Sequence, residues 1–407
     1  MFYPDLVTPY TGIKMKVLVL GTGKMGYGLL KDLSAQKEVD EIVAADANID
    51  AAKATAKRVG SDKVKGVEKL DVSDKKATVN LIKGFDIVTA AIPRTFCDQA
   101  ISATIEAGVS WADIAADFNT VFGMDAAAKR AGVTVIPHCG LDVGTDRILL
   151  GVGSRKLDKV EKLYVACGGF PQKGTPGYYN PINYKISWSW PFAIGGSVGT
   201  CKILKNGKIV EVKVLSDPGP IDFPEPLGHL EAFTNSGLMD VVEHLGLKGV
   251  KDAFGQTIRW PGHCDMWNKL KDLHFLDKEV MKVKGAEISP MDFFEAWGNK
   301  YLQYEDDEGD TICQRVIVTG QKDGTPAKYT YEFVEFQDFK NGLSAMAKTT
   351  AFPCSIVAQM IAMGQMNLPG VIHPAKIGYD EKLSNIFFAE MARRDIKITE
   401  SFERLFN

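Results

Sequence analysis

A buried strand that runs into a glycine-rich turn constrains this chain most. Residues 15–20 are the apolar run Met-Lys-Val-Leu-Val-Leu, and Gly21, Gly23 and Gly26 follow in the spacing Gly-x-Gly-x-x-Gly. In a βαβ unit the first glycine allows a tight turn, the second lets the backbone approach a pyrophosphate, and the third lets the next helix pack closely. The helix N-terminus then offers N–H groups to the phosphates. The pattern predicts a Rossmann dinucleotide-binding site.

The residues beyond the glycines indicate which dinucleotide binds. A second apolar strand over 41–45 ends at Asp46, 20 residues after Gly26. A carboxylate at this place accepts hydrogen bonds from the ribose hydroxyls of NAD but repels the 2′-phosphate of NADP. We therefore expect NAD, with NADP less favoured. Two alternatives stay open: Asp46 caps the helix that follows, or Lys53 or Arg58 of that helix holds a phosphate.

The composition is that of an ordinary globular protein. The 407 residues are 45% hydrophobic and carry a net charge of −3, which is enough chain for two or three domains. The balanced charge gives no basic field for nucleic acid, and no apolar run reaches the roughly 18 residues that span a bilayer. The seven cysteines are scattered without a Cys-x-x-Cys pair. We expect a cytoplasmic protein with a small-molecule substrate. We do not expect it to bind nucleic acid, a membrane or a metal ion.

The periodicity changes along the chain. Short apolar runs alternate with helical stretches from Lys16 to about Pro137, which is typical of a doubly wound parallel sheet. Turn-rich, alternating segments from about 160 to 348 indicate a mainly antiparallel sheet, with a hairpin turn at 322–324. Helical patterns return at 354–366 and 384–394. The chain is therefore predicted to be α/β and to divide into residues 1–14, 15–140, 141–348 and 349–407.

Several segments carry local predictions. Residues 1–14 lack the basic and apolar regions of a secretory signal, and they form either a docking arm or a disordered tail. A short helical insertion is expected near 230–246, and the acidic run 305–310 is expected to be a solvated loop. The aromatic alternation over 184–190 is typical of a strand.

The nicotinamide crevice should lie beyond the carboxyl ends of the parallel strands, because ligands of such sheets bind there. The segments at these ends are 93–97, 113–119 and 138–142. With the glycine turn, they give the expected cofactor contacts: Gly21, Gly23, Lys24, Met25, Gly26, Asp46, Asp71, Val72, Ala91, Pro93 and Cys139.

Five segments, taken in order, resemble the saccharopine dehydrogenase superfamily, most closely its L-lysine 6-dehydrogenase-like members. They cover residues 21–26, 133–144, 184–189, 257–263 and 344–361. The resemblance extends over nearly the whole chain from Met15. It implies an NAD(P)-dependent oxidoreductase that acts at a carbon–nitrogen bond of an amino acid and forms a homodimer or higher homo-oligomer.

The resemblance also implies the role of each domain. Residues 15–140 would bind the dinucleotide, 141–348 would bind substrate and form the subunit interface, and helices of 349–407 would return to the Rossmann domain. Two departures stand out. Val143 replaces the proline of a Leu-Asp-Pro-Gly turn, and Trp190-Pro191 replaces the Pro-Arg of some relatives, so that arginine is missing.

Removal of a hydride from an amine-bearing carbon requires a neutral amine. Since a lysine ε-amine has a pKa of about 10.4, a proton acceptor is needed beside the nicotinamide. His138, at the end of the last strand, is the leading general base, with Asp142 and Asp113 as further candidates for the catalytic site. Asp113 or Asp117 can bind the substrate ammonium. The alternatives are a hydrogen-bonded loop histidine, a helix cap for Asp142 and solvated carboxylates.

The second domain offers groups for the substrate. Tyr184 can donate a hydrogen bond, and Lys185 and Arg259 can pair with a carboxylate. Strand alternation sends Tyr184 and Lys185 to opposite faces, so only one faces the pocket. The alternatives are an aromatic core for Tyr184, a solvated face for Lys185, and a turn-stabilising role for Arg259 and His263.

Three functions remain open. The preferred hypothesis is oxidative deamination of the L-lysine 6-dehydrogenase type, in which the product semialdehyde cyclises. The rival is saccharopine-type chemistry, which joins an amino-acid semialdehyde to a second amino acid. A third is a non-catalytic NAD-binding sensor. Within the enzymatic hypotheses, Cys139 with His138 beside it is an alternative nucleophile for aldehyde oxidation.

Overall fold

The computed structural model describes residues 12 and 14–405. The predictions for the N-terminal tail therefore fall, apart from residues 12 and 14, outside the described residues. The chain divides into two compact units, one built from residues up to Arg155 with Ala347–Ile398 and one from Lys156–Met346 with the residues from Thr399 onward. The boundaries given above for functional domains stay a prediction.

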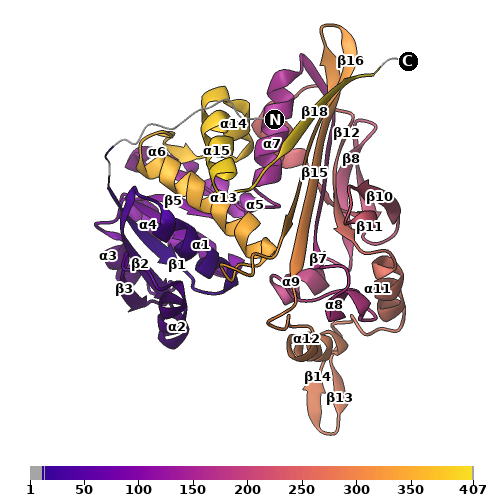
Figure 1. The fold of residues 1–407 in the computed structure, drawn as a ribbon, viewed down its shortest axis with the longest axis horizontal. Coiled ribbons are helices and arrows are strands. Elements are labelled where there is room, and N and C mark those ends of the chain that lie inside the picture. Colours follow the sequence, from indigo (N-terminus) through magenta and orange to yellow (C-terminus); the bar gives the residue numbers. More distant parts are fainter. Residues whose placement is uncertain (1–11, 13, 406–407) are drawn as a thin grey trace. The chain divides into compact units, whose positions relative to one another are not determined.

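Seven parallel strands form the sheet of the first unit, in the order β17-β6-β5-β4-β1-β2-β3. Figure 1 draws this unit mostly in indigo, with β1, β2, β3 and β5 labelled. They are β1 (Met15–Leu20), β2 (Val39–Asp46), β3 (Val64–Lys69), β4 (Ile87–Ala90), β5 (Ser110–Asp113), β6 (Thr134–Ile136) and β17 (Gly370–Val371). The strand order reverses at β1, which has β4 on one side and β2 on the other. In such sheets the ligand binds at this switch point. The predicted doubly wound parallel sheet is confirmed.

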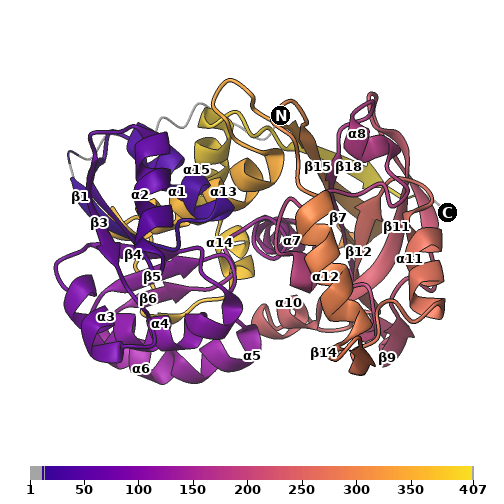
Figure 2. The same ribbon diagram turned by 90° about the horizontal axis from the view of Figure 1, so that it is seen from below.

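Helices cover both faces of this sheet. Figure 2 shows α1 and α13 on one face and α3, α4 and α6 on the other. The helices are α1 (Lys24–Ala35), α2 (Ile49–Val59), α3 (Lys75–Ile82), α4 (Arg94–Glu106), α5 (Phe118–Val121), the 3-10 turn η1 (Phe122–Met124), α6 (Asp125–Ala131), α7 (Thr145–Lys156), α13 (Ala345–Ala362), α14 (Ala375–Tyr379) and α15 (Glu381–Arg393). The predicted return of C-terminal helices to this unit is confirmed.

Local sequence signals set the ends of several helices. The Asn48 side chain accepts hydrogen bonds from the first N–H groups of α2, and Gly60 ends that helix with a left-handed φ of 66°. The Asp74 side chain caps α3. Between the helices, fully buried side chains such as Leu18 and Val88 form the core of the sheet.

The second unit is built on a nine-stranded mixed sheet. Its main path is β10-β11-β12-β7-β15-β16-β18, with β8 and β9 attached beside β12. The strands are β7 (Lys159–Pro171), β8 (Thr200–Lys205), β9 (Lys208–Lys213), β10 (Gly219–Phe223), β11 (Gly228–Gly237), β12 (Asp252–Arg259), β15 (Asp310–Lys322), β16 (Thr325–Phe336) and β18 (Thr399–Arg404). β12 pairs with β7 in parallel and the other neighbours are antiparallel, which confirms the mainly antiparallel prediction.

Short helices and one small hairpin complete this unit (Figure 1). They are α8 (Pro176–Tyr179), α9 (Trp190–Gly195), α10 (Met239–His244), α11 (His263–Asp272), α12 (Pro290–Tyr301) and the strands β13 (Met281–Val283) and β14 (Ala286–Ile288). The predicted hairpin turn joins β15 to β16, where Asp323 and Gly324 both have a positive φ. That geometry suits the right-handed twist of the strands.

The strand predicted over residues 184–190 is wrong. Residues 184–189 have no ladder partner, and α9 begins at Trp190. The Asn180 side chain donates to the Tyr184 carbonyl at 2.8 Å, and the Ile186 N–H donates to the Leu302 carbonyl at 2.7 Å. Tyr184, Ile186 and Trp190 enter one buried cluster, whereas Trp188 is exposed. Lys185 and Ser187 are buried as well, so the segment does not have the two faces of a strand.

Two further local predictions need correction. The first part of the expected helical insertion over 230–246, up to Gly237, is strand β11, because Leu230 and Ala232 alternate with more exposed residues; only α10 is helical. The run 305–310 is not a fully solvated loop, since Glu308 and Asp310 are buried. Asp310 accepts the N–H groups of Ala345 and Met346 at 2.6 and 2.9 Å, where a carboxylate stabilises the start of α13.

No helix in the part of the chain that the structure describes is long and apolar enough to cross a bilayer.

Candidate functional site

The glycine turn has the geometry of a phosphate cradle. A Cβ on Gly21, whose φ is 87°, would lie 2.4 Å from the Ala91 carbonyl oxygen. A Cβ on Gly26 would lie 2.0 Å from the Gly21 oxygen, whereas a Cβ on Gly23 would meet nothing within 4 Å. Packing therefore requires the first and third glycines, and the second leaves open space. No side chain caps the N-terminus of α1, so this end suits a pyrophosphate.

Asp46 holds the cradle in shape. Its Oδ2 accepts the backbone N–H and the hydroxyl of Thr22 at 2.8 and 2.9 Å, and its Oδ1 accepts the Asn48 N–H at 2.9 Å. The Asn48 side chain, rather than Asp46, caps α2. Lys53 and Arg58 are exposed, and the Arg58 guanidinium stacks 4.1 Å above the Tyr27 ring. A half-buried carboxylate thus lies at the end of β2, as the sequence predicts.

The other expected cofactor contacts lie in the first unit. Lys24 and Met25 occupy the first turn of α1, and Ala91 donates its N–H to Leu20 beside the glycine turn. Pro93 precedes α4, and Val72 is half-buried. Asp71 is exposed, and hydrogen bonds from the side chain and backbone of Ser73 lower the pKa of its carboxyl group.

Asp113 is a fully buried carboxylate with several donors. It accepts hydrogen bonds from Trp111 Nε1 and from the Ala115 and Ala116 N–H groups, each at 2.6 Å. Burial raises the pKa of Asp113 against the lowering effect of these bonds, and the net shift is upward. These contacts give Asp113 a role in shaping the turn after β5, and its catalytic role stays a prediction.

His138 and Cys139 follow β6, as expected. His138 is 5% exposed, has a φ of 54°, and lies edge-on to the Phe118 ring at 4.7 Å. Cys139 is fully buried, and its Sγ lies 3.3 Å from the Ile136 carbonyl oxygen. Burial raises the pKa of the Cys139 thiol well above its usual value. The thiolate that nucleophilic catalysis needs is therefore disfavoured.

Asp142 and Asp117 differ in their surroundings. The Asp142 side chain is about a third exposed, and its Oδ1 lies 3.9 Å from Nη1 of the buried Arg147. The Gly144 N–H at the start of α7 donates to Asp146 Oδ1 at 2.8 Å, and the capping role considered for Asp142 stays a prediction. Asp117 caps α5 and accepts the Asn119 N–H at 2.9 Å.

Arg259 in the second unit is a buried cation without a carboxylate partner among the described residues. It ends β12 and is 8% exposed. Its Nη1 donates to the Ile258 carbonyl at 2.8 Å, its Cζ lies 5.4 Å from the centre of the Tyr184 ring, and its Nε meets no partner in the described chain. A buried charge is costly unless it is paired. Arg259 is therefore suited to receive an anionic ligand.

His263 and Tyr184 lie beside Arg259 in the aromatic cluster. His263 is 2% exposed, and its Nδ1 is 3.2 Å from the Ile182 carbonyl oxygen. Burial, with Arg259, lowers the pKa of His263 well below its usual value, so the ring is neutral. Burial raises the pKa of Tyr184, which stays protonated and stacks against Trp190 at 5.6 Å.

Sequence reasoning missed Tyr304. Its buried hydroxyl has no hydrogen-bond partner in the described part of the chain, and it interacts electrostatically with Tyr184 and Arg259. Tyr304 lies in the loop between α12 and β15, where no motif marks it. No group of three His, Cys, Asp or Glu side chains among the described residues is arranged to hold a metal ion.

Lys185 is engaged inside the protein. Its Nζ donates to the Gln303 carbonyl at 2.7 Å and to Glu308 Oε2 at 2.5 Å, and both charged side chains are buried. Burial acts to raise the pKa of Glu308, but hydrogen bonds from the Glu305 and Gly177 backbone and from Lys185 bring it below its ordinary value. The charge that was expected to meet a substrate carboxylate is thus already paired.

Comparison with known proteins identifies the family. The family described as "Saccharopine dehydrogenase NADP binding domain" matches residues 17–136, and "Saccharopine dehydrogenase C-terminal domain" matches 140–396. Saccharopine dehydrogenase [NADP(+), L-glutamate-forming] of Schizosaccharomyces pombe is 24% identical, over 94% of this chain and 98% of its own length. The mitochondrial alpha-aminoadipic semialdehyde synthase of mouse is 23% identical over 89% of this chain, which spans 45% of that protein.

A solved structure agrees in fold. Apo saccharopine dehydrogenase (L-Glu forming) from Saccharomyces cerevisiae aligns with a TM-score of 0.81 at 22% identity, over 96% of this chain and 100% of that one. The expected superfamily is thereby confirmed. Both parts of the chain match the same family in the expected order, and the chain belongs to the saccharopine dehydrogenase family of oxidoreductases.

Proposed function

We propose that this protein is a nicotinamide-nucleotide-dependent oxidoreductase of the saccharopine type. Its substrate is a secondary amine that joins an amino-acid semialdehyde skeleton to a second amino acid. The names of the relatives support this reaction better than the L-lysine 6-dehydrogenase reaction that the sequence favoured.

The buried guanidinium of Arg259, which has no carboxylate partner among the described residues, is the observation that carries the proposal. A saccharopine-type substrate bears several carboxylates, and a planar guanidinium binds a carboxylate at two points. Arg259 is buried, lacks an internal carboxylate among the described residues and lies over the Tyr184 ring. Burial raises the pKa of Tyr184 and of Tyr304, so both hydroxyls stay protonated, and both interact electrostatically with Arg259. We assign carboxylate binding to Arg259, and not to Lys185, whose charge Glu308 already neutralises.

The glycine cradle suits the nucleotide, which would accept a hydride from the carbon beside the substrate nitrogen. The chain itself must keep that nitrogen neutral and activate the water that adds to the resulting imine, after which the carbon–nitrogen bond breaks. We assign proton transfer to His138, in the same unit as the cradle, with the partly exposed Asp142 as second candidate. Asp117 is proposed to contact a substrate ammonium.

We further propose that the nucleotide is NAD. The carboxylate of Asp46 lies at the end of β2, where it suits ribose hydroxyls and repels a 2′-phosphate. The Schizosaccharomyces pombe relative carries NADP(+) in its name, and the family that matches residues 17–136 is described as NADP binding. This chain is therefore proposed to differ from them in its choice of nucleotide.

The experiment that tests the proposed function identifies the products. Purified protein is incubated with saccharopine and either NAD or NADP, with L-lysine and a panel of diamines in parallel. The proposal expects reduced nucleotide and an equal amount of glutamate, without ammonia. Ammonia from L-lysine instead supports the lysine 6-dehydrogenase reaction, and nucleotide binding without turnover of any amine supports the sensor.

The role of Arg259 is tested by kinetics. Arg259→Met is expected to raise KM for the amino-acid substrate by at least about tenfold, the equivalent of roughly 1.4 kcal/mol, with the nucleotide Kd unchanged. Arg315→Met is the matched control, since Arg315 lies in the same sheet but pairs with Glu332. If both substitutions raise KM by the same factor, the assignment of carboxylate binding to Arg259 is wrong.

A further inference from the structure

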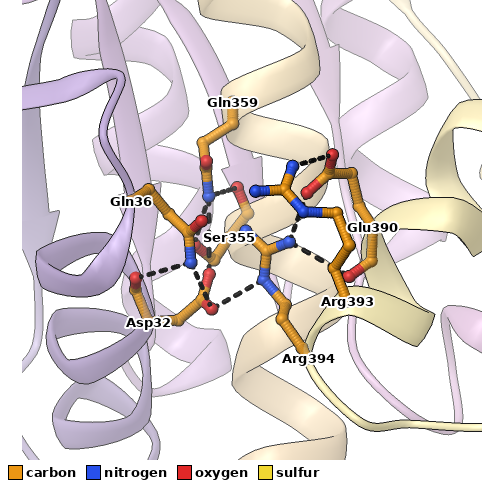
Figure 3. A network of polar contacts seen from close by, with 7 residues as sticks. All are labelled: Asp32, Gln36, Ser355, Gln359, Glu390, Arg393 and Arg394. Atoms are coloured by element: carbon orange, nitrogen blue, oxygen red, sulfur yellow. Dashed lines mark hydrogen bonds and ion pairs between the residues drawn. The ribbon is translucent and has the colours of Figure 1, made fainter. Parts of the chain in front are cut away.

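The helix that carries the glycine turn is bonded at its far end to the C-terminal helices. Figure 3 shows Asp32 of α1 facing Arg394 at the end of α15 and Gln359 of α13. Arg394 Nε donates to Asp32 Oδ1 at 2.6 Å, and Gln359 Nε2 lies 3.4 Å from Asp32 Oδ2. The Asp32 and Arg394 side chains are 2% and 5% exposed. Residues 362 positions apart in the chain thus form one buried polar contact.

Arg394 is oriented by a second carboxylate. Its Nη1 donates to Glu390 Oε2 at 2.6 Å, one turn earlier in α15. Burial acts to lower the pKa of Arg394, but Asp32 and Glu390 outweigh it and the net shift is upward, so the guanidinium keeps its charge. Since Arg394 meets both carboxylates with a rigid guanidinium, it fixes the direction from which α15 approaches α1.

A close backbone contact adds to this bond. A Cβ on Gly28 of α1 would lie 2.7 Å from the Ala351 Cβ and 3.0 Å from the Ala347 carbonyl oxygen of α13. Gly28 lies two residues after Gly26, the last glycine of the cradle. Helix α13 therefore touches α1 just behind the cradle, at Gly28, while Arg394 holds α1 at Asp32, about 6 Å further along the helix at 1.5 Å per residue.

A buried ion pair seldom adds stability over an apolar pair of the same shape, but it does select one arrangement of the elements that carry it. Here the selected arrangement is that of α1, whose N-terminus faces the nucleotide phosphates in the proposed function. We propose that Asp32 and Arg394 are positioning residues for the nucleotide, which they hold indirectly by fixing α1 against the C-terminal helices. This inference rests on the nucleotide binding included in the proposed function.

The test compares two adjacent arginines. Arg394→Met removes the contact with Asp32, whereas Arg393→Met removes only a bond from an exposed side chain to the same Glu390, at 2.7 Å. Phe387→Leu, in the buried face of α15, serves as a variant that loses stability without touching this polar contact. Each folded variant is titrated with NAD by intrinsic fluorescence, well below its melting temperature, and kcat is measured at saturating NAD.

The expected result is a nucleotide Kd raised about tenfold in Arg394→Met, with kcat nearly unchanged and Kd within about twofold of wild type in both controls. Arg394→Lys should recover part of the affinity. The double variant Asp32→Asn, Arg394→Met should bind NAD more tightly than Arg394→Met alone, because no charge is left buried without its partner.

Several results would overturn the inference. An unchanged Kd in folded Arg394→Met, or an equal rise in all three single variants, would show that the contact acts only through general stability. The inference would also be overturned if the changes in NAD binding free energy caused by Asp32→Asn and Arg394→Met simply add in the double variant, because the two residues would then not be coupled. A wild-type protein that binds neither NAD nor NADP would overturn the proposed function and this inference with it, whereas normal wild-type binding with uniform variant effects would overturn this inference alone.

Discussion

Lys185 donates to Glu308 at 2.5 Å inside the second unit, and the two residues are 123 positions apart in the chain. The pair joins the irregular segment before α9 to the loop before β15. Glu308 also accepts the Gly177 N–H at 2.7 Å and the Glu305 N–H at 2.9 Å. One carboxylate thus holds together three segments that have no strand pairing of their own.

Breaking this pair on one side should destabilise the protein. Glu308→Gln is expected to lower the free energy of unfolding by about 3–5 kcal/mol, because Lys185 is left buried without its partner. The double substitution Lys185→Met, Glu308→Leu should lower the free energy of unfolding much less, because it leaves no buried charge without a partner. Urea denaturation near neutral pH measures the difference, with the exposed neighbour substitution Glu305→Gln as control. A loss for Glu308→Gln no larger than that of the control contradicts the account.

The same carboxylate gives a pH dependence. The pKa of Glu308 in the folded protein lies below its ordinary value of 4.5, so its contribution to stability is present above that pH. The contribution is lost as the pH falls below 4.5 and through the folded pKa. In Glu308→Gln this part of the acid-induced loss of unfolding free energy should be absent. Unfolding curves measured between about pH 6 and about pH 3 test this, because that range includes the titration of Glu308.

The second glycine of the cradle should be dispensable for folding and necessary for binding. Gly23→Ala introduces a Cβ that contacts no protein atom within 4 Å but occupies space proposed for the pyrophosphate. The nucleotide Kd is expected to rise at least about tenfold with little change in melting temperature. Gly123→Ala, at another open glycine of this unit, is the control. Gly26→Ala should instead prevent folding, because its Cβ would overlap the Gly21 oxygen.

Asp46 should determine the choice of nucleotide through its charge. Asp46→Ser removes the repulsion of a 2′-phosphate, and the ratio of NADP to NAD affinity is expected to rise by about tenfold or more. Thr22→Val deletes one hydrogen bond to Asp46 but leaves the carboxylate, so its ratio should stay that of wild type. Parallel titrations with both nucleotides give the ratio. An unchanged ratio in Asp46→Ser would assign the discrimination to other residues.

His263 should make the protein less stable in mild acid. Its folded pKa lies well below 6.5, so stability is complete above pH 6.5 and falls at lower pH as the unfolded chain binds a proton that the folded protein does not. The slope approaches about 1.4 kcal/mol per pH unit for one proton. His263→Phe should reduce the slope by this amount, whereas His229→Asn, at an exposed histidine, should keep it. Chemical denaturation at several pH values tests this, and equal slopes in both variants would refute it.

The sequence predicted those features whose physical cause is local. The glycine cradle follows from Gly21, Gly23 and Gly26 in a strand–turn–helix context, and the hairpin turn follows from Asp323-Gly324. The segment 184–190 was misjudged because its regular aromatic spacing imitates strand alternation, although residues 184–187 are all buried and Trp188 is exposed.

Features that depend on distant partners were not predicted from the sequence. Lys185 looked available because nothing nearby marks Glu308 as its partner, and the contact of Asp32 with Arg394 joins opposite ends of the chain. Arg259 was identified as a candidate from its motif, but only the fold shows that it is buried without a carboxylate among the described residues. Tyr304 has no motif and emerges from the structure alone.

The most direct test of the central claim is the ratio of kcat/KM for saccharopine to kcat/KM for L-lysine, measured with NAD by formation of reduced nicotinamide. The account predicts a ratio far above one, with glutamate released in step with nucleotide reduction. A ratio far below one, with ammonia released from L-lysine, would contradict the saccharopine-type reaction and restore the lysine 6-dehydrogenase hypothesis.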